Sequence, residues 1–129
     1  MMAHVTASAL VSENKTFCHP SSVDSVPTAA NYEDHVSMGG WGARKCLKMV
    51  KNVEIVLAVE LLAACQAIDL RRPLKSTPVV EKVFDFVREH ADFMETDRSL
   101  ANEIEAMAKL IQAGKIWELV KDHMEAYVD

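Results

Sequence analysis

One stretch of this chain constrains its fold more than any other: residues 43–72 contain neither glycine nor proline. Such a run predicts a helix roughly 45 Å long, at about 1.5 Å per residue. Residues 55–65 read Ile-Val-Leu-Ala-Val-Glu-Leu-Leu-Ala-Ala-Cys, so apolar side chains point in every direction around the helix axis. Full enclosure takes about six neighbouring helices, more than the rest of the chain can supply. We therefore expect partner helices from a missing N-terminal part, from identical subunits, or from both.

The remaining sequence predicts shorter helices and no convincing strand. Thr77 followed by Pro78 is a typical helix start, and Gly114 is placed to end a helix in the left-handed conformation. The start at Met1 lacks a capping residue, which suggests truncation. We predict one all-α segment over residues 1–129, a long central helix plus shorter amphipathic helices. Its expected parts are a helix at 1–14, a loop at 15–31, a long helix region at 33–72, and helices at 78–92, 99–113 and 115–127.

Charge and cysteine usage narrow the function classes. The formal net charge is −5 and the Lys and Arg residues are spread along the chain, so we expect no nucleic-acid partner. The first residues do not resemble a secretory signal, and Glu60 interrupts the most apolar run, so we expect a cytoplasmic protein without a membrane span. The three cysteines form no C-x-x-C pair and are expected to be reduced, buried thiols.

The densest polar cluster is Tyr32-Glu33-Asp34-His35, where the Pro/Ser-rich loop enters the long helix. Two interpretations stay open. Acidic residues in a first helical turn complement the helix dipole and need no further role. Alternatively, a carboxylate at this junction can accept a proton or anchor a cationic substrate.

Other polar residues favour structural roles. Glu60 lies alone on an apolar helix, so we expect an ion pair with another helix. Cys18 and His19 are adjacent and lack a second pair of ligands, so we expect no metal site. The sequence contains no G-x-S-x-G elbow, so it does not indicate a serine nucleophile. The cations expected on a surface or at an interface are Arg44, Lys45, Lys48 and Lys51.

Several motifs, in the right order, resemble the C-terminal part of the histidine ammonia-lyase family, within the aromatic amino acid ammonia-lyases. The similarity covers most of the chain, is strongest from residue 3 to about 90, and is looser over the last part. The motifs are Ser12-Glu13-Asn14-Lys15, Cys18-His19-Pro20-Ser21-Ser22-Val23-Asp24-Ser25, Glu33-Asp34-His35-Val36-Ser37-Met38-Gly39-Gly40-Trp41 and Leu61-Leu62-Ala63-Ala64-Cys65-Gln66-Ala67.

The resemblance implies a fragment of a helical-bundle lyase fold, a cytosolic homotetramer that converts L-histidine to trans-urocanate and ammonia. It implies that Glu33 faces the substrate, for proton transfer or to grip the imidazole and amine. Tyr32, where the family often has Gln, is assigned to substrate contact. Asp34 and His35 are assigned to orienting neighbouring groups and to helix capping. The long helix would join a bundle shared between subunits.

The same resemblance implies an electrophile, a methylidene-imidazolone ring made by cyclising an internal Ala-Ser-Gly. This chain has Ala7-Ser8-Ala9 but no Ala-Ser-Gly, and a helical Ala9 cannot replace the flexible glycine. We therefore expect no cofactor within this chain and no turnover by the isolated chain, whether or not the complete protein is an enzyme. The alternative is a non-enzymatic helical interaction module, or a truncated product that co-assembles with full-length lyase subunits.

Overall fold

The computed structural model describes residues 2–124 and folds them into five α-helices, with no strand among these residues. The all-α prediction is confirmed. In chain order the elements are α1 (Met2–Phe17), η1 (Ser21–Val23), η2 (Ala29–Asn31), α2 (Gly39–Leu70), α3 (Pro78–Arg88), α4 (Ala101–Gln112) and α5 (Lys115–Met124).

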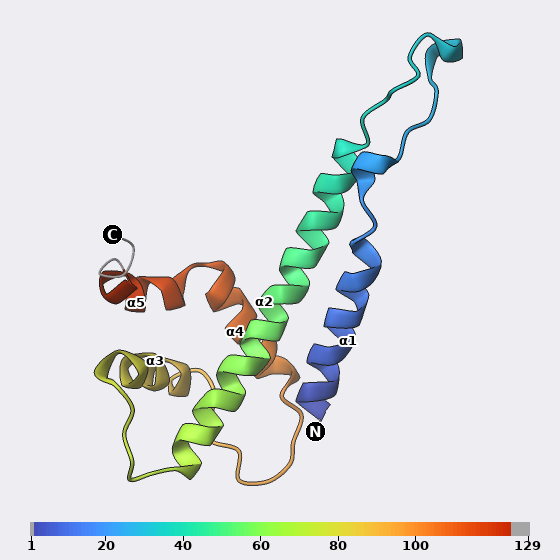
Figure 1. Cartoon of the computed structure of the whole chain (residues 1–129). Coiled ribbons are helices and arrows are strands. Elements are labelled where there is room, and N and C mark those ends of the chain that lie inside the picture. Colours follow the sequence, from blue (N-terminus) through green and yellow to red (C-terminus); the bar gives the residue numbers. More distant parts are fainter. Residues whose placement is uncertain (1, 125–129) are drawn as a thin grey trace.

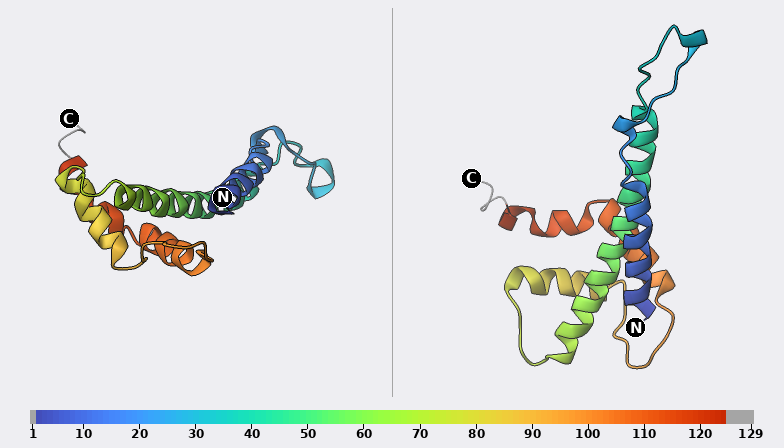
Figure 2. Two further views of the ribbon diagram at one scale, coloured as in Figure 1. Left: turned by 90° about the horizontal axis from the view of Figure 1, so that it is seen from below. Right: turned by 45° about the vertical axis from the view of Figure 1, so that its right-hand side comes forward.

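The long helix α2 is the spine of the molecule (Figure 1). Helix α1 runs antiparallel beside α2, past the middle of that helix as far as Val59 and Ala63, and both views in Figure 2 keep the two helices together. Asn52 joins them, because its side-chain nitrogen donates to Glu13 Oε2 (2.7 Å) and Asn14 Oδ1 (2.9 Å). Helices α3 and α4 pack against the C-terminal half of α2, and α5 packs on α3 and α4. The connection between α1 and α2 therefore lies alone at one end.

Most helix boundaries follow the local signals. Thr77 is the N-cap of α3 and Pro78 its first residue, as predicted. Gly114, with φ of 73°, separates α4 from α5, also as predicted. Helix α1 continues past its predicted end to Phe17, because no breaker precedes the His19-Pro20 pair. The last helix is confirmed as far as Met124, whereas Tyr127 lies outside the described residues.

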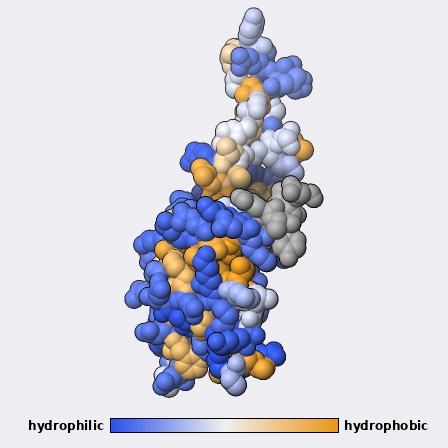
Figure 3. Space-filling view, turned by 90° about the vertical axis from the view of Figure 1, so that its left-hand side faces the viewer, coloured by the Kyte–Doolittle hydropathy of each residue, from blue (hydrophilic) through white to orange (hydrophobic). Residues whose placement is uncertain are grey.

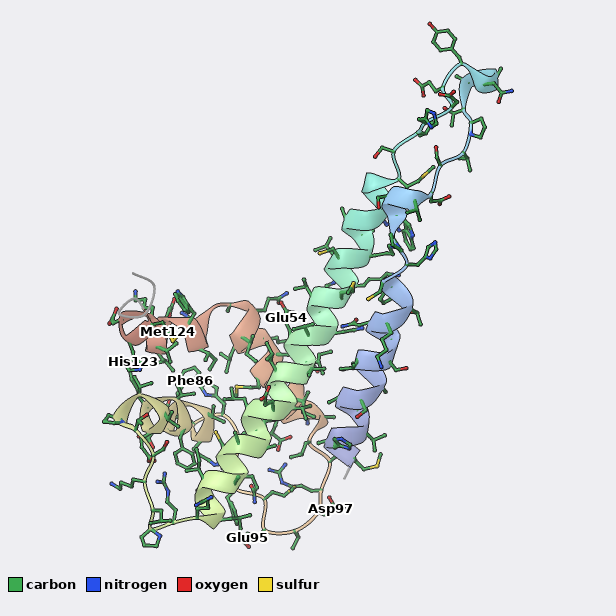
Figure 4. The ribbon with its side chains drawn as sticks, in the orientation of Figure 1. Glu54, Phe86, Glu95, Asp97, His123 and Met124 are labelled. Atoms are coloured by element: carbon green, nitrogen blue, oxygen red, sulfur yellow. The ribbon has the colours of Figure 1, made fainter. Side chains whose placement is uncertain are left out.

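The hydrophobic core lies between the C-terminal half of α2 and helices α3 and α4. Met107 and Val87 are its largest fully buried side chains. The other buried members are Ala58, Leu62, Cys65, Phe84 and Ala91. Figure 4 shows Phe86 on the side of α3 that faces His123 and Met124 of α5, so these two helices also pack against each other. Burial of this apolar surface is the main source of stability.

Ion pairs and hydrogen bonds frame this core. Arg88 pairs with Asp69 at 2.7 Å and donates to the Ala91 carbonyl at 2.9 Å, which fixes the end of α3 against α2. The Gln66 side chain bonds the backbone of Met94 in both directions, at 3.0 and 3.1 Å. These contacts tie the loop after α3 to the spine.

The apolar rod at residues 55–65 is covered on one face only. The side chains buried on that face are Ala58, Val59, Leu62 and Cys65. On another face Leu57 is 43% exposed, and the exposed stripe continues toward the start of α2 through Val53, Val50 and Leu47. The expectation that this chain cannot enclose the rod alone is confirmed for residues 2–124.

The two ends of the molecule differ in the hydropathy of their surfaces. Figure 3 looks onto the side that carries α3 and α5 and shows hydrophobic surface gathered within hydrophilic rims on the lower part. The narrow upper projection mixes hydrophilic, intermediate and small hydrophobic patches in that view. Among residues 2–124, no helix has the length and apolar character needed to cross a membrane.

Candidate active-site arm

The connection between α1 and α2, residues 18–38, forms a hairpin that we call the arm. Its first residues, with η1, lie against the start of α2, and its distal part projects beyond the end of the helix pair (Figure 1). None of its residues is buried, and all of them lie within the described part of the chain. The predicted cluster Tyr32-Glu33-Asp34-His35 lies on this arm. Hydrogen bonds, not apolar packing, must therefore fix its shape.

Lys45 of α2 holds the base of the arm. Its ammonium group donates to the carbonyl oxygen of His19, and the residue is only 8% exposed. The prediction that Lys45 lies on a surface or interface is wrong, because the chain folds back over it and supplies an acceptor. Its neighbours Arg44 and Lys48 do remain exposed, within 6.0 Å of the Trp41 ring centroid.

Ser25 ties the two sides of the arm together. Its hydroxyl oxygen accepts from the backbone N–H of Val36 at 2.9 Å. The same oxygen lies 3.2 Å from the Val36 carbonyl and 3.3 Å from the Asp34 carbonyl, the acceptors available to its proton. The hydroxyl thus accepts from one backbone N–H and donates its single proton to one of these two carbonyls, groups that would otherwise need water.

At the tip the chain reverses through three successive residues with positive φ, Ala29 (49°), Ala30 (55°) and Asn31 (68°). Left-handed backbone costs an alanine about 1–2 kcal/mol, so the tip is a strained turn. A pair of backbone hydrogen bonds closes it, from Thr28 N–H to Glu33 O at 2.8 Å and from Glu33 N–H to Thr28 O at 3.3 Å.

The closed turn places Glu33 in the open. Glu33 is exposed, and its Oε2 accepts a hydrogen bond from the Thr28 hydroxyl at 3.1 Å. Tyr32 beside it is 90% exposed. The tip therefore carries a carboxylate and a phenol, neither covered by residues 2–124.

Asp34 and His35 lie apart from the tip. Asp34 contributes its backbone carbonyl to Ser25, and His35 lines a cavity of about 670 Å³ at the base of the arm. The prediction that these two residues cap the long helix is wrong. The predicted start of the long helix region at residue 33 is also wrong. The helix begins at Gly39, its N-cap is Met38, and the Ser37 hydroxyl accepts from the Gly39 N–H at 3.2 Å.

The basal cavity also holds two of the three thiols, Cys18 and Cys46, and both are exposed. The expectation of buried thiols holds only for Cys65, whose pKa is raised by burial in the core. Within the described residues, no group of three or more His, Cys, Asp or Glu side chains is placed to hold a metal ion.

Glu60 differs from its prediction. It is exposed beside a second cavity of about 540 Å³ between α1, α2 and α4, and no partner for its carboxylate is found among residues 2–124. The predicted ion pair with another helix is therefore wrong for the helices of this chain. Two arginines that line the same cavity form ion pairs with other carboxylates: Arg98 pairs with Glu103, and Arg88 pairs with Asp69.

Sequence reasoning missed two residues of the arm, Thr28 and Ser25. Both have short hydroxyl side chains within a Pro/Ser-rich stretch, a pattern typical of side chains that bond nearby backbone. That pattern could have marked them as organisers of the loop. It could not have identified their partners, because these lie five and eleven residues further along the chain.

Comparison with known proteins assigns this fold to a class. The sequence model of the aromatic amino acid lyase family matches residues 1–89, well over half of the chain. The chain therefore belongs to the aromatic amino acid lyase family.

The similar proteins narrow the relationship within the family. The chain is 56% identical to the histidine ammonia-lyases of Bos taurus and of Homo sapiens over 127 residues, 98% of this chain and 19% of each relative. It resembles the crystal structure of histidine ammonia-lyase from Trypanosoma cruzi with a TM-score of 0.90 and 53% identity, over 95% of this chain and 24% of that one.

A more distant structure shares the same arrangement. Tyrosine aminomutase from Streptomyces globisporus matches with a TM-score of 0.87 and 34% identity, over 93% of this chain and 23% of that one. In every one of these comparisons, this chain spans about a fifth to a quarter of the relative's length.

Proposed function

We propose that this chain is the part of a histidine ammonia-lyase that carries Glu33 into the active site, where L-histidine is converted to trans-urocanate and ammonia. The observation that carries the proposal is the arm: a carboxylate is held at the end of a hydrogen-bonded hairpin and left uncovered. The similarity to proteins named histidine ammonia-lyase at 56% identity supports the choice of substrate.

A carboxylate at this position suits histidine. The reaction removes a proton from the β-carbon and the amino group from the α-carbon, which leaves a double bond between them. An imidazole N–H or an ammonium group can donate to the Glu33 carboxylate, whereas a phenyl ring cannot. Glu33 would thus act as a proton acceptor or as an anchor for the substrate cation. Tyr32, also exposed, is placed for a further contact with substrate.

The residues of this chain do not fit the methylidene-imidazolone electrophile that the family resemblance implies. Ala7-Ser8-Ala9 lies inside the regular helix α1, whose backbone hydrogen bonds hold these residues away from a cyclisation geometry. We therefore assign no step to a group formed here, and the proposal requires an Ala-Ser-Gly segment outside these 129 residues.

The exposed stripe on α2 supports assembly with identical or full-length lyase subunits. Leu57, Val53, Val50 and Leu47 form an apolar row that residues 2–124 leave uncovered. The same row favours the second candidate function, a helical interaction module without activity of its own. The proposed location is the cytoplasm.

Two proteins test the proposal: the isolated chain, and a chimaera in which this chain replaces the matching segment of the Trypanosoma cruzi enzyme. Urocanate absorbance is followed after addition of L-histidine. We expect none from the isolated chain and turnover by the chimaera. Glu33→Ala in the chimaera should lower kcat by at least about 10²-fold, as for loss of an acid-base group. Near-normal turnover by that variant would remove Glu33 from the mechanism, and an inactive but correctly assembled chimaera would favour the interaction module.

A further inference from the structure

We infer that Thr28 is a positioning residue that orients the Glu33 carboxylate toward the substrate. The inference rests on the proposed role of Glu33 and goes further, because it states what aims this side chain. Glutamate has three rotatable bonds, and an exposed glutamate explores many rotamers unless something restrains it. On the arm, the restraint comes from Thr28.

Three hydrogen bonds join these two residues. The backbone pair, at 2.8 and 3.3 Å, fixes the separation of their main chains. The Thr28 hydroxyl then donates to Glu33 Oε2 at 3.1 Å. The strained residues Ala29, Ala30 and Asn31 form the short link that brings the two together. Thr28 therefore holds both the backbone and the side chain of Glu33.

The geometry also distinguishes the two carboxylate oxygens. Oε2 is taken by Thr28, while no hydrogen bond to Oε1 is found among residues 2–124. Oε1 is thus the oxygen presented to the substrate. A hydrogen bond to an ionised group is stronger than one between neutral groups, so the hydroxyl restrains the carboxylate most firmly in its charged form.

The test uses the chimaera defined above. Thr28→Val keeps the β-branched shape but removes the hydroxyl, and should lower kcat/KM for L-histidine at least about ten-fold. Thr28→Ser keeps the hydroxyl and should restore most of that loss. Thr6→Val is the matched control, because within residues 2–124 the Thr6 hydroxyl bonds only the Met2 carbonyl of its own helix, at 3.0 Å. All variants should unfold at the same temperature.

A merely structural threonine would behave differently in a double-variant cycle. When Glu33→Ala is already present, adding Thr28→Val should change kcat/KM by less than two-fold, because Thr28 acts through Glu33. Equal effects of Thr28→Val with and without Glu33 would overturn the inference. So would full activity of Thr28→Val beside a strongly impaired Glu33→Ala, a result that leaves the proposed function intact. An unimpaired Glu33→Ala would instead refute the proposed function.

A second measurement needs no catalysis. In NMR spectra of the isolated 129-residue chain, the side-chain couplings of Glu33 should report one dominant rotamer. Thr28→Val should average them over several rotamers, and Thr6→Val should leave them unchanged. Glu33 couplings that do not respond to Thr28→Val would overturn the inference even if the chimaera failed to assemble.

Discussion

The two ends of α2 are held in opposite ways. At its C-terminal half, α2 packs against α3 and α4 through a core that includes the fully buried Met107 and Val87. At its N-terminal end, the arm contains no buried residue and depends on hydroxyl and backbone hydrogen bonds. Stability and candidate chemistry thus reside in different regions. Substitutions in the core should leave the hydrogen bonds of the arm nearly unaltered, and substitutions on the arm should leave the packing of the core nearly unaltered.

The core should give the largest effect. Met107→Ala removes a fully buried side chain and should lower the free energy of unfolding by about 2–5 kcal/mol. Urea denaturation of the isolated chain measures the change. Hydrogen exchange at Thr28 and Glu33 should stay the same under native conditions. Faster exchange at the tip would show that the arm depends on the core after all.

The ion pair at the end of α3 should rank second. Arg88→Met keeps much of the side-chain volume but breaks the bonds to Asp69 and to the Ala91 carbonyl. We expect a loss of about 1.5–3 kcal/mol, typical of hydrogen bonds that involve charged groups. Arg71→Met is the matched control, because Arg71 is exposed at the end of α2. Equal losses from both variants would contradict this ranking.

The strained tip predicts a change of the opposite sign. Ala30 has φ of 55°, so Ala30→Gly relieves left-handed strain at the cost of a more flexible unfolded chain. The net gain should be at most about 1 kcal/mol. Ala64→Gly, at an exposed position within α2, should instead destabilise by about 1 kcal/mol. Denaturation of both variants checks the sign, and destabilisation by Ala30→Gly would show that the turn is unstrained.

The smallest effect concerns pH. The hydrogen bond from Arg72, helped by the backbone N–H of Ser76, lowers the pKa of Glu81 below its ordinary value of 4.5. A lowered folded-state pKa means that this pair stabilises the fold above about pH 4.5, and that its contribution is lost as pH falls through the folded value. Between about pH 6 and pH 3, the free energy of unfolding should fall less steeply with decreasing pH in Glu81→Gln than in the unaltered chain. Glu95→Gln, a change at an exposed site, is the control.

The helical scaffold was predictable because its signals are local. Thr77 with Pro78, and Gly114, mark boundaries that depend on a few neighbouring residues, and the structure places them as predicted. The uniform apolar character of residues 55–65 likewise predicted a rod that this chain cannot cover. Local backbone preference and side-chain periodicity were sufficient for these features.

The arm was less predictable because its contacts are not local. Asp34 and His35 looked like the first turn of a helix. Ser25, however, bonds the backbone of Val36 and holds this segment out of a helix, and the helix starts only at Gly39. Lys45 looked like one more surface cation, since its acceptor at His19 lies 26 residues away in sequence. No pattern in the sequence reveals such a partner.

The closed turn between Thr28 and Glu33 has an evolutionary consequence. A tip that contributes no buried side chain can exchange the residues around position 32 with little effect on the thermodynamic stability of the scaffold. Under the proposed function, new substrate preferences can arise by point substitution at the tip, without compensating mutations in the helices. The hairpin is in this sense an adaptable module on a separately stabilised helical frame.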